Sequence, residues 1–231
     1  MKRLEAVSLD VTGTLIHCPS MGEIYAEVLG RHGVEVTAED VRRTFRVVWQ
    51  ELDCLTPAGG DRFSTYPGGS RAWWGRLIER LCELLEAGRP SPFAVAELYH
   101  RFEDAESWQL YADTLEALDR LRSLDLRLAV VSNFDERLPV ILSGLGLAPR
   151  FDAVVVSSEL GVAKPNPLIF RSLLDRLDLA APSVAHLGNS PREDVEGAEA
   201  AGLFALLVRR SDENDPGLLR AVSQLVARRA G

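Results

Sequence analysis

The sequence predicts an α/β protein: a doubly wound parallel sheet with an all-helical domain inserted after its first strand. After Trp108, short apolar runs alternate with amphipathic segments of about ten residues, a pattern typical of parallel strands joined by right-handed helical crossovers. A further apolar run at residues 4–9 belongs to the same sheet. The stretch between these two parts has helical spacing throughout, so we expect it to be an insertion.

Length and composition indicate a folded protein with one core and one large insertion. The chain has 231 residues and a mass of 25.4 kDa, which is short for two independent enzymes. Hydrophobic residues make up 46% and charged residues 26%, which argues against an intrinsically disordered chain. We therefore expect a full hydrophobic core.

Charge and cysteine content limit the classes of partner. The net charge is −8 and the pI is about 5.1, which disfavours nucleic-acid binding because that needs a basic surface. Cys18, Cys54 and Cys82 are odd in number and far apart, so they indicate neither a disulfide framework nor a CxxC site. The sequence has no apolar run of about 18 residues and no signal-peptide pattern at its start. We expect a cytoplasmic protein that acts on a small molecule and does not bind membranes, while the oligomeric state is left open.

The first strand and the inserted block come first in chain order. Residues 4–9 are apolar, end at Asp10 and run into a tight loop at Gly13. Apolar residues then recur at helical spacing in four stretches, at 24–29, 41–52, 77–85 and 95–102. A stretch rich in glycine and proline, residues 57–69, predicts a loop between the second and third helices.

The remainder of the chain alternates between helices and strands. Helical spacing predicts helices at residues 114–124, 138–145, 167–177 and 194–201. Apolar runs predict strands at residues 126–131, 153–156, 184–187 and 203–208. Both faces of the sheet should therefore be covered by helices, as parallel sheets require.

Polar residues follow four of the predicted strands or lie just beyond them. Ligands of an open parallel sheet bind at the carboxyl ends of its strands, so these residues are the candidate site. They are Asp10 with Thr12, Gly13 and Thr14, then Ser132 with Asn133, then Lys164, and finally Asn189 with Asp194.

Each of these residues has a structural explanation beside the functional one. Asp10 can act as a nucleophile or cap the loop that follows it. Ser132 can hold an oxygen of an anion or begin a helix, and Asp194 can bind a cation or cap a helix. Of 26 basic residues only Lys2 and Lys164 are lysines, so Lys164 indicates a site that takes a compact charge better than a guanidinium. A surface position for Lys164 is the alternative.

Taken in order, the patterns D-x-x-G-T, S-N, K-P and G-N-x-x-x-x-D-x-x-G-A resemble the four motifs of the haloacid dehalogenase-like hydrolase superfamily. The resemblance covers the whole chain. It implies a Rossmann-like core at residues 1–15 and 110–231 and a helical cap, of the type inserted after the first strand, at residues 16–109.

The resemblance also implies roles for the candidate residues. In the phosphatases of the superfamily, the residue that corresponds to Asp10 attacks phosphorus and forms an aspartyl-phosphate. Ser132 would bind a phosphate oxygen, Lys164 would neutralise charge, and Thr14 and Asn133 would contact substrate. Mg²⁺ would be held by Asp10, the main-chain carbonyl of Thr12 and the fourth motif. In this chain the fourth motif offers Asn189, with Asp194 nearby.

Two positions depart from the phosphatase pattern. Thr12 stands where the family usually has a second aspartate, which protonates the leaving group. A hydroxyl cannot supply that acid near neutral pH, so we expect roughly 10²- to 10⁴-fold slower hydrolysis of poor leaving groups. Asn189 stands where an aspartate usually binds the metal, and a neutral amide should bind Mg²⁺ more weakly.

Three functions remain open, and a phosphatase is favoured. The run K-P-N-P-x-x-F and the G-N-S pattern are similar to the broader hydrolases of the superfamily. The departures at Thr12 and Asn189 are similar to the metal-independent 2-haloacid dehalogenases, in which a cap arginine binds the substrate carboxylate. Arg42, Arg43 and Arg46 are the candidates for that arginine. The third alternative is a weakly active binding or regulatory protein.

The segment 66–74 is a candidate for substrate specificity. It runs from Tyr66 through adjacent glycines to Arg71 and the pair Trp73 and Trp74. A cap closes over the nucleophile, and Arg71 is the cation that we expect to bind a distal anionic group of the substrate. The two indoles could equally pack inside the cap.

Overall fold

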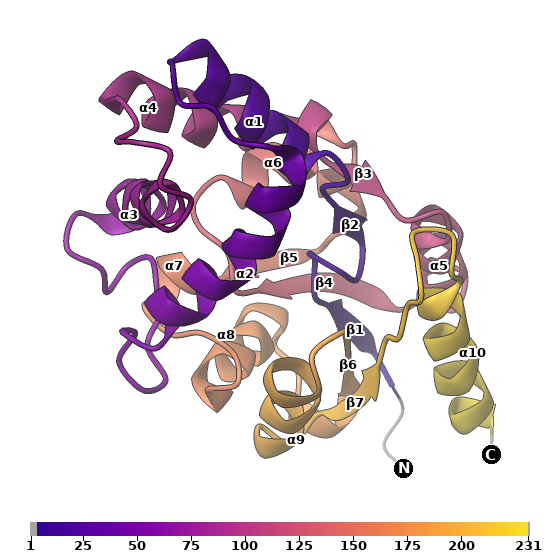
Figure 1. Cartoon of the computed structure of the whole chain (residues 1–231). Coiled ribbons are helices and arrows are strands. Elements are labelled where there is room, and N and C mark those ends of the chain that lie inside the picture. Colours follow the sequence, from indigo (N-terminus) through magenta and orange to yellow (C-terminus); the bar gives the residue numbers. More distant parts are fainter. Residues whose placement is uncertain (1–3, 231) are drawn as a thin grey trace.

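A five-stranded parallel sheet forms the centre of the protein (Figure 1). The computed structural model describes residues 4–230. The strands lie in the order β5, β4, β1, β6, β7, and all four neighbouring pairs are parallel. This order confirms the predicted doubly wound sheet. The bounds are Ala6–Leu9 for β1, Arg127–Ser132 for β4, Ala153–Val156 for β5, Val184–Gly188 for β6 and Phe204–Leu207 for β7.

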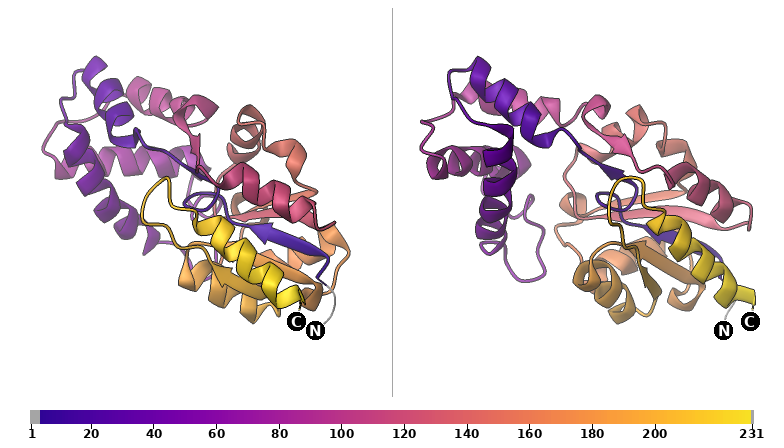
Figure 2. Two further views of the ribbon diagram at one scale, coloured as in Figure 1. Left: turned by 90° about the vertical axis from the view of Figure 1, so that its right-hand side faces the viewer. Right: turned by 45° about the vertical axis from the view of Figure 1, so that its right-hand side comes forward.

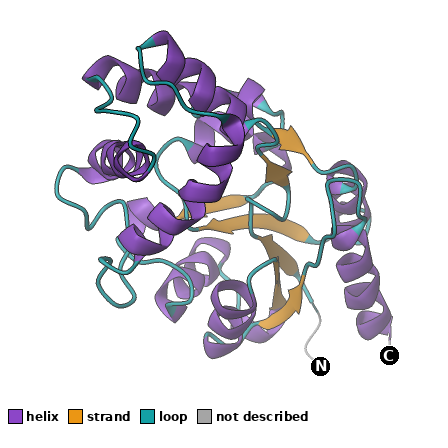
Figure 3. Cartoon of the chain, in the orientation of Figure 1, coloured by secondary structure: helices purple, strands orange, loops and turns teal. Residues whose placement is uncertain are grey.

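Helices cover both faces of this sheet (Figure 3). One face packs against α5 (Thr114–Arg122), α6 (Leu138–Gly144) and α10 (Gly217–Ala230). The other face packs against α8 (Pro167–Leu177) and α9 (Gly197–Ala200). Strands of this kind are buried on both sides, which explains why they read as unbroken apolar runs. The sequence patterns did not predict α10.

Four helices between β2 and β3 form a separate helical block (Figure 2). They are α1 (Met21–Arg31), α2 (Ala38–Asp53), α3 (Gly69–Leu84) and α4 (Pro92–Arg101). The block has its own hydrophobic cluster, in which Trp73 is fully buried among residues of α1 to α4. The predicted loop at 57–69 lies between α2 and α3, while the division of the chain into two domains stays a prediction.

A two-stranded antiparallel ribbon joins the helical block to the rest of the protein. Strand β2 (Ile16–His17) pairs with β3 (Gln109–Leu110), so Ile16 lies opposite Leu110 and His17 opposite Gln109. The two connections of the block therefore run side by side (Figure 1). Strands of two residues are too short to predict from the sequence.

Short helical turns complete the chain. They are η1 (Ala105–Ser107), η2 (Ala148–Arg150), α7 (Ser157–Leu160), η3 (Ala181–Ser183) and η4 (Pro191–Glu196). The element η4 is a π-helix that runs directly into α9, so the helix predicted at 194–201 begins earlier and is wider in its first turns. Among the helices within residues 4–230, none combines the length and the hydropathy needed to cross a bilayer.

Candidate active site

The carboxylate of Asp10 lies at the centre of the site, directly after the middle strand β1. Its Oδ1 accepts a hydrogen bond from Lys164 Nζ at 2.7 Å, and its Oδ2 accepts one from Thr14 Oγ1 at 3.2 Å. Burial raises the pKa of the Asp10 carboxyl, and the adjacent Lys164 ammonium opposes that rise. Asp10 is thus a buried carboxylate that is paired with a cation.

Lys164 bridges two carboxylates. Its ammonium lies 2.7 Å from Asp10 Oδ1 and 2.6 Å from Asp194 Oδ1, and its side chain is 1% exposed. Burial opposes the charge of Lys164, but the two carboxylates together raise the pKa of the ammonium above its ordinary value. The lysine is therefore a buried, permanently charged group, and the alternative of a surface lysine is excluded.

Asn133 fixes the backbone of Lys164. Its Oδ1 accepts from Lys164 N at 2.7 Å, and its Nδ2 donates to Lys164 O at 2.9 Å. Both polar ends of the amide are occupied by this one residue. Asn133 thus positions the backbone of the lysine, and because it also lines the cavity described below, the expected substrate contact stays a prediction.

Asp194 holds the lysine from the other side. Its Oδ2 accepts from Ser190 N at 2.8 Å, and its Oδ1 lies 3.2 Å from His186 Nε2 as well as near Lys164. Burial opposes ionisation, but Lys164 and His186 hold the pKa of the Asp194 carboxyl well below its usual range. Both oxygens of Asp194 are engaged within the protein.

His186 and Ser8 are site residues that the sequence patterns did not single out. They face each other across the pairing of β1 with β6, and Ser8 Oγ lies 2.8 Å from His186 Nδ1. Burial lowers the pKa of His186, and its two ring nitrogens contact Asp194 and Ser8. A lone histidine in the apolar strand AHLG was the available signal, but it did not indicate a role.

The other predicted residues surround Asp10. Ser132 ends β4 next to β1 and is 2% exposed. Thr12 is exposed in the loop after β1, where its backbone bridges to Ile16. Asn189 follows β6, and its side chain packs against Gly13 of that loop. The carboxyl ends of β1, β4 and β6 therefore bring these predicted residues together.

The oxygen donors beside Asp10 fit a weakly held Mg²⁺. Within residues 4–230, no group of three or more histidine, cysteine, aspartate or glutamate side chains could hold a metal ion. The remaining donors are one carboxylate at Asp10, the carbonyl of Thr12 and the amide of Asn189. Mg²⁺ commonly keeps several waters and takes one or two carboxylates plus substrate phosphate, and a donor set with one carboxylate and two neutral oxygens is chemically compatible with that preference.

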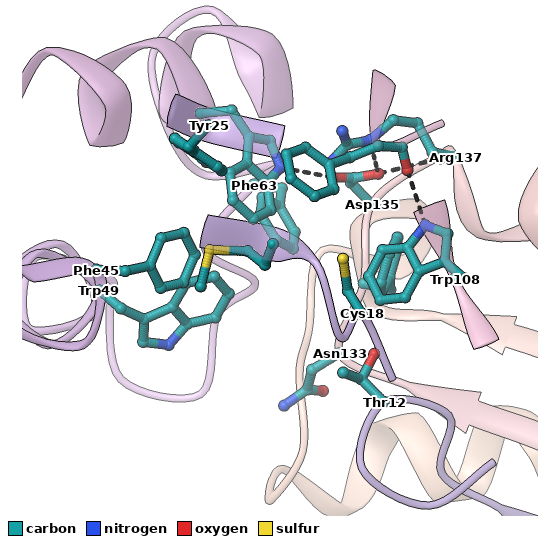
Figure 4. Close-up of a pocket in the computed structure, with 14 residues that line it drawn as sticks. Thr12, Cys18, Tyr25, Phe45, Trp49, Phe63, Trp108, Asn133, Asp135 and Arg137 are labelled. Carbon is teal, nitrogen blue, oxygen red and sulfur yellow. Dashed lines mark hydrogen bonds and ion pairs between the residues drawn. The ribbon is translucent and has the colours of Figure 1, made fainter. Parts of the chain in front are cut away.

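A cavity of about 370 Å³ opens beside Thr12 and Asn133 (Figure 4). In the figure, the rings of Phe45 and Trp49 from α2 lie across from Thr12. Aromatic side chains from the helical block and from the sheet side dominate its walls: Tyr25, Phe45, Trp49, Phe63, Trp74, Phe102, Trp108 and Phe134. The volume is in the range of small-molecule binding sites.

The two charged residues of the cavity wall, Asp135 and Arg137, form an ion pair with each other. Arg137 donates to both oxygens of Asp135, from Nε at 2.9 Å and from Nη2 at 2.6 Å. The third nitrogen of the guanidinium, Nη1, donates to the carbonyl of Tyr99 at 2.9 Å. Asp135 also accepts from Trp74 Nε1 at 2.7 Å. This pair is buried and fully hydrogen-bonded within the protein.

Hydrogen bonds hold the helical block over the loop that follows β4. Ser70 Oγ and Tyr99 Oη both donate to Glu136 Oε1, at 2.5 and 2.6 Å. A second connection lies beyond β5, where Ser157 Oγ donates to Asp61 Oδ2 at 2.6 Å. The block therefore covers the cavity from above the carboxyl ends of the strands.

None of the predicted arginines is among the described residues that line the cavity. Arg71 is exposed, and its guanidinium lies over the ring of Tyr99, outside the described lining of the cavity. Arg42, Arg43 and Arg46 are exposed on α2, where Arg42 pairs with Glu23 and Arg43 with Asp40. The two adjacent tryptophans have different surroundings. Trp73 lies in the core of the helical block, and Trp74 lines the cavity.

Comparison with known proteins identifies the relatives of the chain. The family model of haloacid dehalogenase-like hydrolases matches residues 4–202. Haloacid dehalogenase-like hydrolase domain-containing protein 3 from Mus musculus is 35% identical, over 95% of this chain and 88% of that protein. Phosphoserine phosphatase from Thermus thermophilus is 36% identical, over 90% of this chain and 89% of that enzyme. The structure of L-2-haloacid dehalogenase from Xanthobacter autotrophicus shares the fold, with a TM-score of 0.71 and 21% identity over 97% of this chain and 83% of that chain.

Proposed function

The chain belongs to the haloacid dehalogenase-like hydrolase family, and we propose that it is a phosphatase of small-molecule phosphate monoesters that reacts through Asp10. The observation that carries this proposal is the buried ammonium of Lys164, 2.7 Å from the Asp10 carboxylate. A phosphate dianion that approaches a carboxylate needs such a cation beside it. The 36% identity to a phosphoserine phosphatase supports the same reaction class.

In the proposed reaction an oxygen of Asp10 attacks phosphorus while the ester P–O bond breaks. The leaving oxygen takes the bond's electrons and later a proton from water. Water then attacks the phosphorus of the aspartyl-phosphate, releases inorganic phosphate and restores the carboxylate. Lys164 neutralises charge during both steps, Ser132 donates to a phosphate oxygen, and Thr14 orients Asp10 through its hydrogen bond.

Mg²⁺ is the proposed cofactor, held by Asp10, the Thr12 carbonyl and Asn189. When bound it supplies further positive charge beside the phosphate. Asp194 was a candidate ligand, but its hydrogen bonds to Lys164, His186 and Ser190 support a positioning role. Asp194 keeps the lysine ammonium directed at Asp10.

The alternative functions have less support. A 2-haloacid dehalogenase needs a cation for the substrate carboxylate, yet Arg137 at the cavity is neutralised by Asp135. Arg42, Arg43 and Arg46 are exposed on α2. A regulatory protein without catalytic activity would not need a buried lysine that pairs with both Asp10 and Asp194.

An assay panel tests the proposal. The purified protein is incubated with acetyl phosphate, phenyl phosphate and 2-chloropropionate, each with Mg²⁺ and with EDTA, and the release of phosphate or chloride is measured. We expect phosphate release that needs Mg²⁺ and is lost in Asp10→Asn. Chloride release in EDTA would instead identify a dehalogenase, and no turnover of any compound would support a regulatory protein.

A further inference from the structure

The cavity beside Asp10 points to a chemical class of substrate. We propose that the protein hydrolyses aryl phosphates, in which an uncharged aromatic alcohol is esterified to phosphate, and that the ring fills the cavity while the phosphate faces Asp10. This inference rests on the proposed phosphatase function and makes it more specific. Three properties of the cavity carry it: size, wall chemistry and the absence of an acid at Thr12.

The size of the cavity suits one or two fused rings. An engineered apolar cavity of about 150 Å³ is enough to bind benzene. The volume here is about 370 Å³, and the cavity reaches Thr12 and Asn133, which lie beside the site. A ring in this space would lie against Thr12, in the loop that follows Asp10, and against Asn133, which follows Ser132.

The walls favour a flat apolar group. Rings from different elements meet at the cavity, and Trp74 lies close to both Phe63 and Trp49, with ring centroids 6.0 and 5.8 Å apart. Aromatic groups pack well against such surfaces in stacked and edge-on arrangements. A flexible aliphatic or sugar phosphate would leave much of this apolar surface unmatched.

The cavity offers no free charge to a zwitterionic or anionic substrate. Among the described residues that line it, the ions are Asp135 and Arg137, and each is the other's partner at 2.6 Å. Burial raises the pKa of the Cys18 thiol to about 11, so this wall group is neutral as well. The ammonium and carboxylate of phosphoserine would therefore be buried here without partners, which is strongly unfavourable.

The leaving group completes the argument. Thr12 occupies the position of the usual acid, and a hydroxyl cannot protonate an alkoxide near neutral pH. Phenols have a pKa of about 10, as tyrosine does, so they leave as phenolates without help. As the bond from Asp10 to phosphorus forms, the bond from phosphorus to the ring oxygen breaks, and the phenolate takes its proton from water. The ease with which the leaving group departs and the apolar lining of the cavity therefore both favour aryl phosphates.

Steady-state kinetics with four esters test the inference. The purified full-length protein is assayed with Mg²⁺ on 1-naphthyl phosphate, phenyl phosphate, 4-carboxyphenyl phosphate and phosphoserine, with acetyl phosphate as the reference for the phosphoryl site. We expect kcat/KM to fall in that order, with at least tenfold between naphthyl and carboxyphenyl phosphate. The carboxyphenyl ester has a better leaving group than phenyl phosphate, so a lower value than that of phenyl phosphate reports the charge and not the chemistry. Equal or higher values for phosphoserine would overturn the inference.

Two variants locate the effect in the cavity. Phe45→Ala removes a ring of the wall, and we expect it to lower kcat/KM for naphthyl phosphate at least tenfold more than for acetyl phosphate. The matched control is Phe93→Ala, because Phe93 lies on α4 of the same block and is 79% exposed. It should leave all rates unchanged. Equal losses on both substrates in Phe45→Ala would remove the cavity from substrate binding.

A binding measurement separates this inference from the proposed function. Acetyl phosphate turnover without an aryl preference would refute the aryl class and leave the phosphatase standing. If the protein hydrolyses no phosphate, the phosphatase proposal fails, and tryptophan fluorescence of Asp10→Asn decides the cavity's role. Naphthyl phosphate should then bind at least tenfold more tightly than phosphoserine, and equal affinities would contradict the inference.

Discussion

The side chain of Asn189 covers the face of Gly13 on which any other residue would carry its β-carbon. An ideal Cβ at Gly13 would lie 2.2 Å from Asn189 Nδ2, and the backbone of Gly13 has a φ of +83°. The loop after β1 and the loop after β6 therefore fit together only with glycine at this position. That contact brings the amide of the fourth motif to the loop that follows Asp10.

Gly13→Ala should lower the free energy of unfolding by about 1–3 kcal/mol, because alanine combines an unfavourable φ with a clash against Asn189. Chemical denaturation gives the value. The control is Gly30→Ala in α1, where the new methyl group meets nothing within 4 Å. That change should stabilise the protein by about 0.5–1 kcal/mol. Equal effects of the two substitutions would contradict the described packing.

Asp10→Asn should abolish phosphate release while the protein stays folded, since the amide keeps the size of the side chain and removes the nucleophile. Lys164 retains its contact with Asp194 in this variant. Rate measurements and circular dichroism check the two halves of the prediction. More than a few per cent of the wild-type rate would show that Asp10 is not the nucleophile.

Activity should require Mg²⁺ at millimolar concentration, because Asn189 contributes a neutral oxygen where a carboxylate would bind more strongly. Asn189→Asp should shift half-saturation to lower Mg²⁺. Titration of phosphate release with Mg²⁺ measures both proteins. Full activity in EDTA would assign the protein to metal-independent chemistry.

Thr12→Asp should increase the rate on alkyl phosphates more than on aryl or acyl phosphates, because the introduced carboxyl can protonate a poor leaving group. Comparison of kcat for a matched alkyl and aryl ester measures the effect. If both esters gain equally, a missing acid is not what limits the wild-type protein.

Asp135→Ala should destabilise the protein by about 3–5 kcal/mol, since it leaves the buried Arg137 without its carboxylate. The double variant Asp135→Ala with Arg137→Met should recover much of that loss, because no isolated charge remains. Urea denaturation of the wild-type protein and of both variants gives the free energies of unfolding to be compared. Without any recovery, the buried charge would not be the cause.

The apolar runs predicted the five strands, and the motifs singled out Asp10, Ser132 and Lys164, whose roles stay predictions. Both signals are local in the sequence. The role of His186 was not predictable in this way. It depends on the register that sets Ser8 opposite His186 and on the turn that returns Asp194 to the same place. In the sequence a histidine inside an apolar strand is indistinguishable from an ordinary core residue.

The cavity was missed for a related reason. Its rings come from widely separated segments, and within each helix they stand at the spacing of residues that pack inside the helical block. Trp73 and Trp74 are adjacent in the chain, yet only Trp74 reaches the cavity and Asp135. Which of two neighbouring indoles faces a ligand depends on the rotation of α3 about its axis, and that rotation is fixed by tertiary packing.

Because β2 and β3 are paired, the helical block is an insertion that could be replaced by another without changing the core. Both of its ends leave the ribbon side by side, at the spacing of roughly 5 Å that separates hydrogen-bonded strands. Because the entropy of closing a loop rises only slowly with length, inserts of very different sizes can join the same two ends. Recombination at this ribbon would replace the part of the cavity wall that α1 to α4 supply and leave Asp10, Lys164 and Asp194 in their places.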